Sequence, residues 1–197
     1  RFQLFWLRWQ ARVALLLGLR EDALRAFEAM LGIDPAHAYA LASAAQIENQ
    51  LGRTDRALTL QRQAVELDPR QPAGWFNLGF MLEQAGHLED ALAAFRETTR
   101  LAPSLDRAWY GLGLVLIQLR RFDEAVEALR KNTELQPMSP YGWYQLARVH
   151  VDRQEPDEAT RIIRHLKGFE PKVAAQLERE TDRKSTRLNS SHSDRSR

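Results

Sequence analysis

A chain of 197 residues with 44% hydrophobic and 27% charged residues is long enough for one or two ordinary domains or one short repeat array. It contains no cysteine, which excludes a disulfide framework, a thiolate metal site and a cysteine nucleophile. Of its 28 basic and 26 acidic residues, five basic and two acidic ones lie in residues 182–197, which leaves 23 against 24 in the remainder. Residues 1–181 are therefore slightly acidic, so nucleic-acid binding is the function least expected of this chain.

The first 20 residues contain apolar positions spaced by three and four, which predicts an amphipathic helix. These positions are Phe2, Phe5, Trp6, Trp9, Val13 and Leu16. The longest uncharged run, residues 13–19, falls short of the roughly 20 residues of a membrane span. We interpret the segment as a packing helix and not as a signal or transit peptide. Because the chain begins with Arg1, its native start is expected to lie upstream.

Two columns of residues recur every 34 positions along the chain. The prolines of the first column are Pro35, Pro69, Pro103, Pro137 and Pro171. The alanines of the second column are Ala23, Ala57, Ala91, Ala125 and Ala159. Ten positions in phase indicate internal repeats rather than chance. The predicted repeats are residues 4–37, 38–71, 72–105, 106–139 and 140–173.

Each repeat is predicted to form two short helices. The first helix, such as residues 73–85, carries apolar residues at helical spacing, among them Trp75, Leu78 and Leu82. A glycine then follows at the position of a left-handed cap in three repeats, as Gly18, Gly52 and Gly86. The second helix opens with acidic residues, which complement its free N–H groups and positive dipole end. The proline closes the unit because it suits a helix boundary and not an interior.

This layout resembles the tetratricopeptide repeat family, whose period is 34 residues. The family positions are matched most fully by Trp75, Leu78, Gly79, Gly86, Ala91, Phe95 and Pro103. The resemblance covers residues 4–173 and implies an all-α fold, a right-handed α-solenoid of stacked antiparallel helix pairs. The chain departs from the family pattern at Arg120 and Gln154 in place of the turn glycine, Gln61 in place of the aromatic, and Leu7 and Leu41 in place of tryptophan.

The end of the chain is predicted to differ from the array of residues 1–181. Val173, Ala174 and Leu177 give residues 172–181 one apolar stripe, as expected of a capping helix that shields the last repeat. Residues 182–197 are rich in Ser and Arg without apolar periodicity, so we expect disorder there. Residues 182–192, DRKSTRLNSSH, resemble the translation of a sequencing-library adapter. We interpret this tail as non-biological and expect the native C-terminus to be missing.

No constellation of residues suggests catalysis. Five scattered histidines, His37, His87, His150, His165 and His192, are interpreted as surface or packing residues, with only a loose metal-ligand spacing between His150 and His165. Gly111 and Gly113 lie within a predicted helix, which is the wrong context for a nucleotide-binding fingerprint. Ser43 and Ser104 have no evident histidine and acidic partners. We therefore expect no enzyme activity, no cofactor and no metal.

The family resemblance implies that the first helices line a concave groove that binds a partner. The partner-binding positions carried over are Tyr39, Gln46, Phe76, Asn77, Phe80, Arg107, Tyr110, Tyr144, Gln145 and Arg148. Further groove positions are Phe5, Arg8, Trp9, Arg12, Ser43, Asn49, Gln84, Leu114, Gln118 and Tyr141. Aromatic anchors beside amides fit a peptide-binding surface, and the arginines are suited to a carboxylate. The alternative is that aromatics such as Phe76, Tyr110 and Tyr144 pack against adjacent helices.

Three functions stay open at this point. The leading one is a non-catalytic, cytoplasmic scaffold that binds a protein or peptide of unknown identity, with no membrane span and no nucleic acid. The lysine–asparagine clamp of chaperone-tail-binding relatives is not matched, so that partner is not expected. The second is the interaction domain of a truncated larger enzyme, such as a repeat-containing glycosyltransferase. The third is self-assembly into a homo-oligomer through the N-terminal helix, by way of Phe2, Phe5 and Trp6.

Overall fold

The structure is a computed structural model that describes the backbone of residues 2–193 and the side chains of residues 2–183. Within this described part the secondary structure is entirely helical, which confirms the predicted all-α repeat fold. The chain divides into two compact units, one ending at Pro103 and the other beginning at Ser104. None of the helices in residues 2–193 is both long and apolar enough to cross a bilayer.

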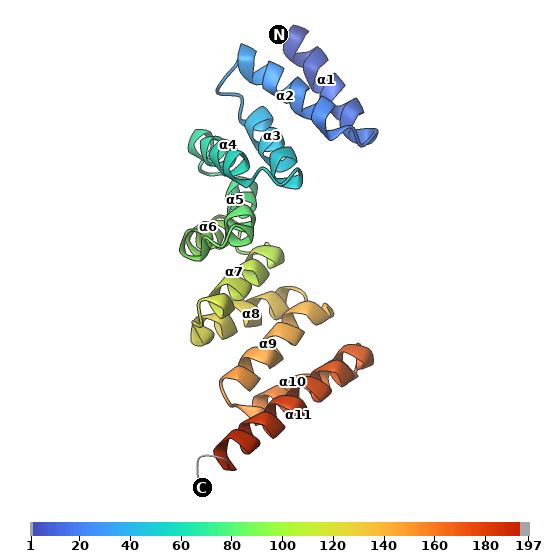
Figure 1. Cartoon of the computed structure of the whole chain (residues 1–197), viewed down its shortest axis with the longest axis vertical. Coiled ribbons are helices and arrows are strands. Elements are labelled where there is room, and N and C mark those ends of the chain that lie inside the picture. Colours follow the sequence, from blue (N-terminus) through green and yellow to red (C-terminus); the bar gives the residue numbers. More distant parts are fainter. Residues whose placement is uncertain (1, 194–197) are drawn as a thin grey trace. The chain divides into compact units, whose positions relative to one another are not determined.

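The first unit consists of three helix pairs (Figure 1). Its helices are α1 (Phe2–Leu16), α2 (Arg20–Ile33), α3 (Ala38–Gln50), α4 (Thr54–Leu67), α5 (Pro72–Gln84) and α6 (Leu88–Leu101). The two helices of each pair pack most extensively on each other, while α2 also packs on α3 and α4 on α5. Each second helix therefore lies between its own first helix and the next one, as expected of stacked repeats.

The second unit contains two helix pairs and a longer final helix. Its helices are α7 (Asp106–Gln118), α8 (Phe122–Leu135), α9 (Pro140–Asp152), α10 (Pro156–Lys167) and α11 (Pro171–Ser193). α11 packs on α10 and, less extensively, on α9. It continues beyond the expected end of the cap at residue 181, and residues 182–193 contain no proline or glycine that would end a helix. The expected disorder of the tail otherwise concerns residues 194–197, which lie outside the described residues.

The repeating residues have distinct structural roles. All five alanines of the second column are fully buried, because a small side chain lets the two helices of a pair approach closely. The tryptophans at the family position, Trp75, Trp109 and Trp143, are half-buried. The indole N–H of Trp75 donates to the carbonyl oxygen of Pro69 at 2.8 Å, and that of Trp143 donates to Pro137 at 2.9 Å. In these two repeats the tryptophan therefore holds the loop that contains the proline.

The turn after each first helix keeps one backbone conformation even where its sequence changes. Gly18, Gly52 and Gly86 have φ angles of 74°, 77° and 79°, as predicted for left-handed caps. Arg120 and Gln154 occupy the equivalent positions with φ angles of 59° and 62°. The surrounding helices therefore impose the left-handed turn on two residues that do not favour it.

The predicted packing helix at the start of the chain is present as α1, which packs on α2, but not through its aromatic stripe. α1 packs through the opposite face, where Ala11 and Ala14 are buried and Leu4 and Leu7 are partly buried against the core of the first unit. The members of the stripe are instead exposed, for example Phe2 at 77% and Leu16 at 87%. Small residues on this opposite face allow closer contact with α2 than indole rings would.

Candidate functional site

In the first unit, the predicted partner-binding face joins α1 to α3. The guanidinium carbon of Arg8 lies 4.8 Å from the ring centre of Tyr39, within the range of a cation–π interaction. The edge of the Tyr39 ring also contacts the buried Phe27, with ring centres 5.8 Å apart. Tyr39 nevertheless remains 41% exposed. It is therefore an oriented aromatic side chain that keeps free surface.

The same face continues from α3 to α5 through amide side chains. The Nδ2 atom of Asn49 donates to Oε1 of Gln84 at 3.0 Å, which links the two first helices. Gln46 is exposed on α3, while Phe80 is 42% exposed and Asn77 half-buried on α5. The first unit therefore combines exposed aromatic rings with amide groups able to donate and accept hydrogen bonds.

Phe76 belongs more to the interior than to this face. Its ring meets the buried Phe95 of α6 edge to face, with ring centres 5.9 Å apart. The alternative interpretation, in which the aromatic contacts a neighbouring helix, therefore describes Phe76. On α5, Phe80 is the aromatic with the larger exposed fraction.

In the second unit, the predicted residues lie on α7 and α9. Arg107 and Arg148 are exposed, whereas Tyr110, Tyr144 and Gln145 are half-buried. The guanidinium carbon of Arg148 lies 5.7 Å from the ring centre of Tyr144. The two helices contact each other directly, so they present these residues on neighbouring surfaces.

α11 already occupies part of the second unit's face. The hydroxyl of Tyr144 lies 2.9 and 3.0 Å from the two carboxylate oxygens of Glu180, to which it donates, and it accepts a 3.3 Å hydrogen bond from Gln176. Desolvation raises the pKa of the Tyr144 phenol, and the Glu180 carboxylate raises this pKa further, while Arg148 lowers it to a smaller extent. Glu180 and Gln176 were not predicted as site residues, because α11 is not a full repeat.

His150 and His165 make structural contacts. The Nδ1 atom of buried His150 lies 2.6 Å from Oε2 of Glu155, and this hydrogen bond is the main reason that the pKa of Glu155 is lowered. Arg153 pairs with Glu155 and with Asp123 of α8, which ties the last two repeats together. Among the described residues, histidines and carboxylates form no group of three that could hold a metal ion. His165 packs on Trp143 with ring centres 4.4 Å apart.

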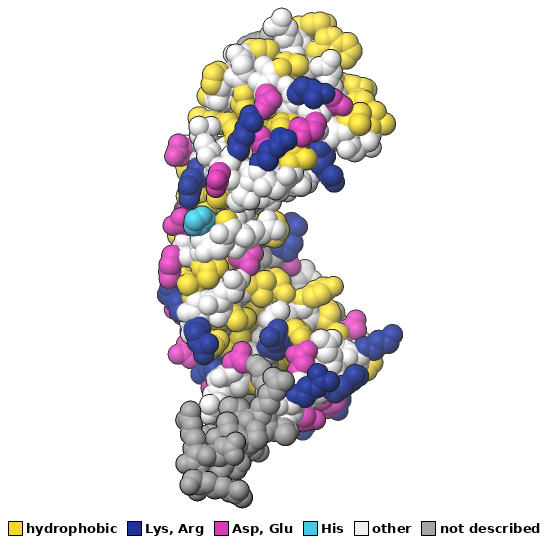
Figure 2. Space-filling view, in the orientation of Figure 1, with side chains coloured by type: hydrophobic (Ala, Val, Ile, Leu, Met, Phe, Trp, Pro, Cys, Tyr) yellow, Lys and Arg dark blue, Asp and Glu magenta, His cyan; other side chains and the backbone are white. Residues whose placement is uncertain are grey.

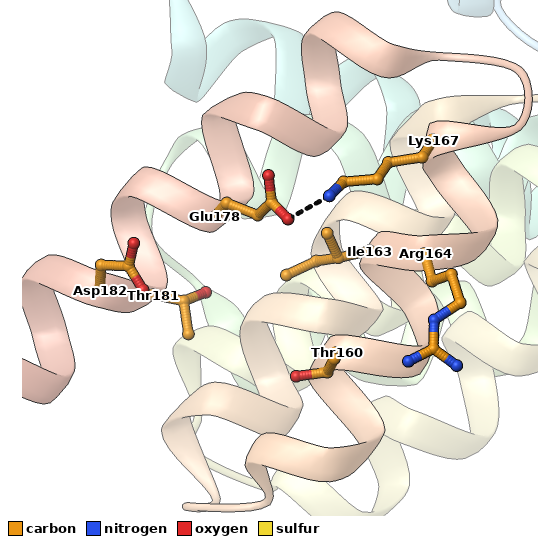
Figure 3. Close-up of a pocket in the computed structure, with 7 residues that line it drawn as sticks. All are labelled: Thr160, Ile163, Arg164, Lys167, Glu178, Thr181 and Asp182. Atoms are coloured by element: carbon orange, nitrogen blue, oxygen red, sulfur yellow. Dashed lines mark ion pairs between the residues drawn. The ribbon is translucent and has the colours of Figure 1, made fainter.

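Two small pockets lie at the ends of the described array. One of about 280 Å³ is formed on α1 by Phe5, Arg8, Trp9 and Arg12. The other, of about 300 Å³, lies between α10 and α11 (Figure 3) and is lined by Thr160, Ile163, Arg164, Lys167, Glu178, Thr181 and Asp182. In the second pocket, the Lys167 ammonium pairs with the Glu178 carboxylate at 2.5 Å. This pairing leaves the second pocket without a strong field of either sign.

Comparison with protein-family models identifies tetratricopeptide repeats along most of the chain. One such model matches residues 10–72, 81–140 and 110–164, and a second matches residues 60–93. Comparison with curated proteins gives no significant match.

Several solved structures have the same fold. MamA, from residue 41 to its end, of Desulfovibrio magneticus RS-1 has a TM-score of 0.79 at 22% identity, with 91% of this chain and 97% of that chain covered. A tetratricopeptide repeat protein of Parabacteroides merdae has a TM-score of 0.83 at 21% identity, over 96% of this chain and 77% of that chain. YrrB, described as a protein of this type with an unusual peptide-binding site, has a TM-score of 0.77 at 18% identity, over 86% and 88%.

Proposed function

Because the chain belongs to the tetratricopeptide repeat family, we propose that it is a non-catalytic scaffold whose first helices bind a peptide or protein segment in their groove. This fold is typical of protein-interaction scaffolds, and YrrB, which shares it, is described as having a peptide-binding site. Fold alone does not specify function, so the proposal depends on the surface residues.

The observation that carries the proposal is the composition of the α3–α5 face. Tyr39 and Phe80 are each about two-fifths exposed, at 41% and 42%, and lie on helices joined by the hydrogen bond between Asn49 and Gln84. Aromatic rings held by neighbouring contacts lose little side-chain entropy on binding. The amide of Gln46 beside them offers a donor and an acceptor to an extended backbone.

The second unit supplies a related surface. Tyr110 and Arg148, on α7 and α9, combine an aromatic ring with a guanidinium that is suited to a partner carboxylate. Because Glu180 and Gln176 hold the Tyr144 hydroxyl, we expect Tyr144 to contribute less than Tyr110. A partner that contacts Tyr144 must first displace these two side chains.

Selection from a displayed random-peptide library, followed by fluorescence anisotropy with the selected peptide, tests the proposal. One variant combines Tyr39→Ala with Phe80→Ala, and a second combines Tyr110→Ala with Arg148→Ala. We expect at least one pair to weaken binding by roughly tenfold or more, as for aromatic and arginine anchors. Leu67→Ala is the matched control, because Leu67 is an exposed apolar residue, 46% exposed, on the second helix α4.

The melting temperature of each variant separates a binding role from a packing role. A pair of substitutions that weakens binding while the melting temperature stays near that of the parent supports the proposal. If both pairs leave binding unchanged, or if Leu67→Ala weakens it equally, the first-helix face is not the binding site.

A further inference from the structure

α1 is apolar on two opposite faces, and only one of them is covered in its unit. The outer stripe of α1, defined here as Phe2, Phe5, Trp6, Trp9, Val13 and Leu16, lies opposite the buried Ala11 and Ala14. Its four aromatic residues are between 54% and 77% exposed. Figure 2 shows hydrophobic side chains gathered over this end of the first unit. A helix that is apolar all round is normally covered on all sides.

Two residues of the outer stripe, Trp9 and Leu16, are large and apolar in α1 alone, as the 34-residue register shows. Positions equivalent to Trp9 are polar or small in every later repeat, as Ser43, Asn77, Gly111 and Gln145. Positions equivalent to Leu16 are all polar, as Gln50, Gln84, Gln118 and Asp152. Trp9 and Leu16 therefore do not follow from the needs of a repeat, and another contact must account for them. Val13 differs, because its equivalents are the buried apolar residues Ile47, Met81, Val115 and Val149.

Trp6 occupies the position at which the first helix of a later repeat packs against the helix that precedes it. Its equivalents are the small residues Ala40, Gly74, Ala108 and Gly142. A Cβ on Gly74 would lie 3.3 Å from Val65 of α4, and a Cβ on Gly142 would lie 3.1 Å from Thr133 of α8. The fold therefore presents this position to a helix. In α1 an indole, 57% exposed, replaces the small residue, so a helix seated here must lie further from the α1 backbone.

The charges along the stripe indicate the character of that helix. Residues 2–16 contain no acidic residue. Arg8 and Arg12 border one edge of the stripe and form the pocket of about 280 Å³ with Phe5 and Trp9. Within the described residues neither guanidinium forms an ion pair, and Arg8 only stacks on Tyr39. Carboxylates on a partner would neutralise this edge with charge-assisted hydrogen bonds.

The size of the stripe is sufficient for a specific contact. Aromatic side chains present about 150–250 Å² each, so the four rings expose on the order of 500 Å². This is at the upper end of the apolar patches found on monomers, and such patches are often functional. The 15 residues of α1 extend about 22 Å, which matches a partner helix of about four turns.

We propose that the outer stripe of α1 is a docking surface for an acidic amphipathic helix of a partner protein. The apolar side of that helix covers Trp6 and Trp9, and its carboxylates pair with Arg8 and Arg12. A membrane surface fits less well, because basic residues border only one edge of the stripe, whereas Gln3 and Gln10 border the other. Arg8 and Trp9 are also predicted groove positions, but this contact with a helix goes beyond the proposed peptide binding and does not require Phe80.

The test uses two synthetic, fluorescein-labelled helical peptides about four turns long. Both carry leucines spaced by three and four; the remaining positions are mainly glutamate in one peptide and lysine in the other. The parent protein is expected to bind the acidic peptide roughly tenfold or more tightly than the basic one, and added salt should reduce this difference. Fluorescence anisotropy measures both affinities.

Three variants assign the binding to the stripe. Trp6→Ala with Trp9→Ser introduces residue types that later repeats hold at these positions, so the fold is expected to persist while binding of the acidic peptide falls roughly tenfold or more. Arg8→Glu with Arg12→Glu should reverse the preference in favour of the basic peptide. Met138→Ser is the matched control, because Met138 is 68% exposed before α9 and equivalent to Phe2, and it should change nothing.

Several outcomes would overturn the proposal. Equal binding of the two peptides, no binding, or binding that the α1 variants leave intact each excludes an acidic helix on the stripe. Binding to phosphatidylserine–phosphatidylcholine vesicles that depends on Trp6 and Trp9, without peptide binding, assigns the surface to membranes instead. Light scattering that reveals self-association lost in the same variants, again without peptide binding, assigns it to a second copy. Phe80→Ala tests the groove separately, because Phe80 lies on α5 outside the outer stripe and its loss should leave acidic-peptide binding intact.

Discussion

The substitution Gly113→Ala tests how closely the two helices of a pair must pack. A Cβ on Gly113 would lie 2.7 Å from Cγ and Cδ2 of Leu129, which is fully buried on α8. Carbon atoms in contact are normally about 3.5–4.0 Å apart, so α8 must shift by about 1 Å or Leu129 must change its rotamer. Overpacking of this kind costs about 1–3 kcal/mol, whereas the better helix propensity of alanine contributes up to about 1 kcal/mol. We expect a net loss of about 0.5–2 kcal/mol.

Gly32→Ala is the matched control, because it makes the same change within α2 where no atom lies within 4 Å of the added Cβ. Only helix propensity changes there, and the free energy of unfolding should rise by about 0.5–1 kcal/mol. Urea denaturation followed by circular dichroism measures both variants. The opposite signs follow from the packing alone, so a Gly113→Ala protein as stable as its parent would refute the reasoning.

Four further substitutions test local features of the array. Arg120→Gly should stabilise the protein by up to about 1 kcal/mol because it relieves a left-handed residue with a φ angle of 59°, whereas Gly52→Ala at 77° should lower the melting temperature. The hydrogen bond with His150 lowers the pKa of Glu155 in the folded state. The ionised Glu155 carboxylate therefore stabilises the fold above its ordinary pKa of 4.5, and this stabilisation is lost as pH falls through the lower folded pKa. Glu155→Gln should therefore weaken the dependence of the urea midpoint on pH below about 4.5; an unchanged dependence would exclude this role. Trp143→Phe removes the 2.9 Å hydrogen bond to a proline carbonyl and should cost about 0.5–1.5 kcal/mol in guanidinium denaturation, so equal midpoints would show that this bond does not hold the loop.

Much of the fold could be predicted because stacking imposes the same requirement on every repeat. A buried alanine and acidic residues in the first turn of the second helix recur in every helix pair, and a capping glycine such as Gly86 occurs in three of them. These requirements are local in sequence, so they recur every 34 residues and can be recognised without a structure. The predicted first helix at residues 73–85 therefore agrees with α5 to within one residue at each end.

Features outside the repeat pattern could not be predicted in the same way. Periodicity indicates that α1 has an apolar face, but α1 has two, and close packing selects the one with Ala11 and Ala14. The contact of Tyr144 with Glu180 joins residues 36 apart, on a helix that is not a full repeat. Trp75 and Trp143 are half-buried and donate a hydrogen bond to a proline carbonyl oxygen in the loop, which composition alone does not indicate.

The partner-binding residues were predicted from family positions. The contacts of the described residues separate those that pack on neighbouring helices from those that keep an exposed surface. Phe76 packs in the interior on Phe95, and Tyr144 is held by α11, whereas Tyr39 and Phe80 keep about two-fifths of their surface exposed. A pattern of residue types cannot separate these cases, because an aromatic side chain serves equally well as an anchor for a partner and as a contact between helices.

Hydrogen–deuterium exchange with and without the selected peptide tests the central claim most directly. If the first helices bind the partner, the peptide should slow amide exchange in α3 and α5, or in α7 and α9. Exchange in the second helices α4, α6 and α8 should then remain nearly unchanged. Protection confined to the second helices at saturating peptide, with no change in α3, α5, α7 or α9, would contradict the account.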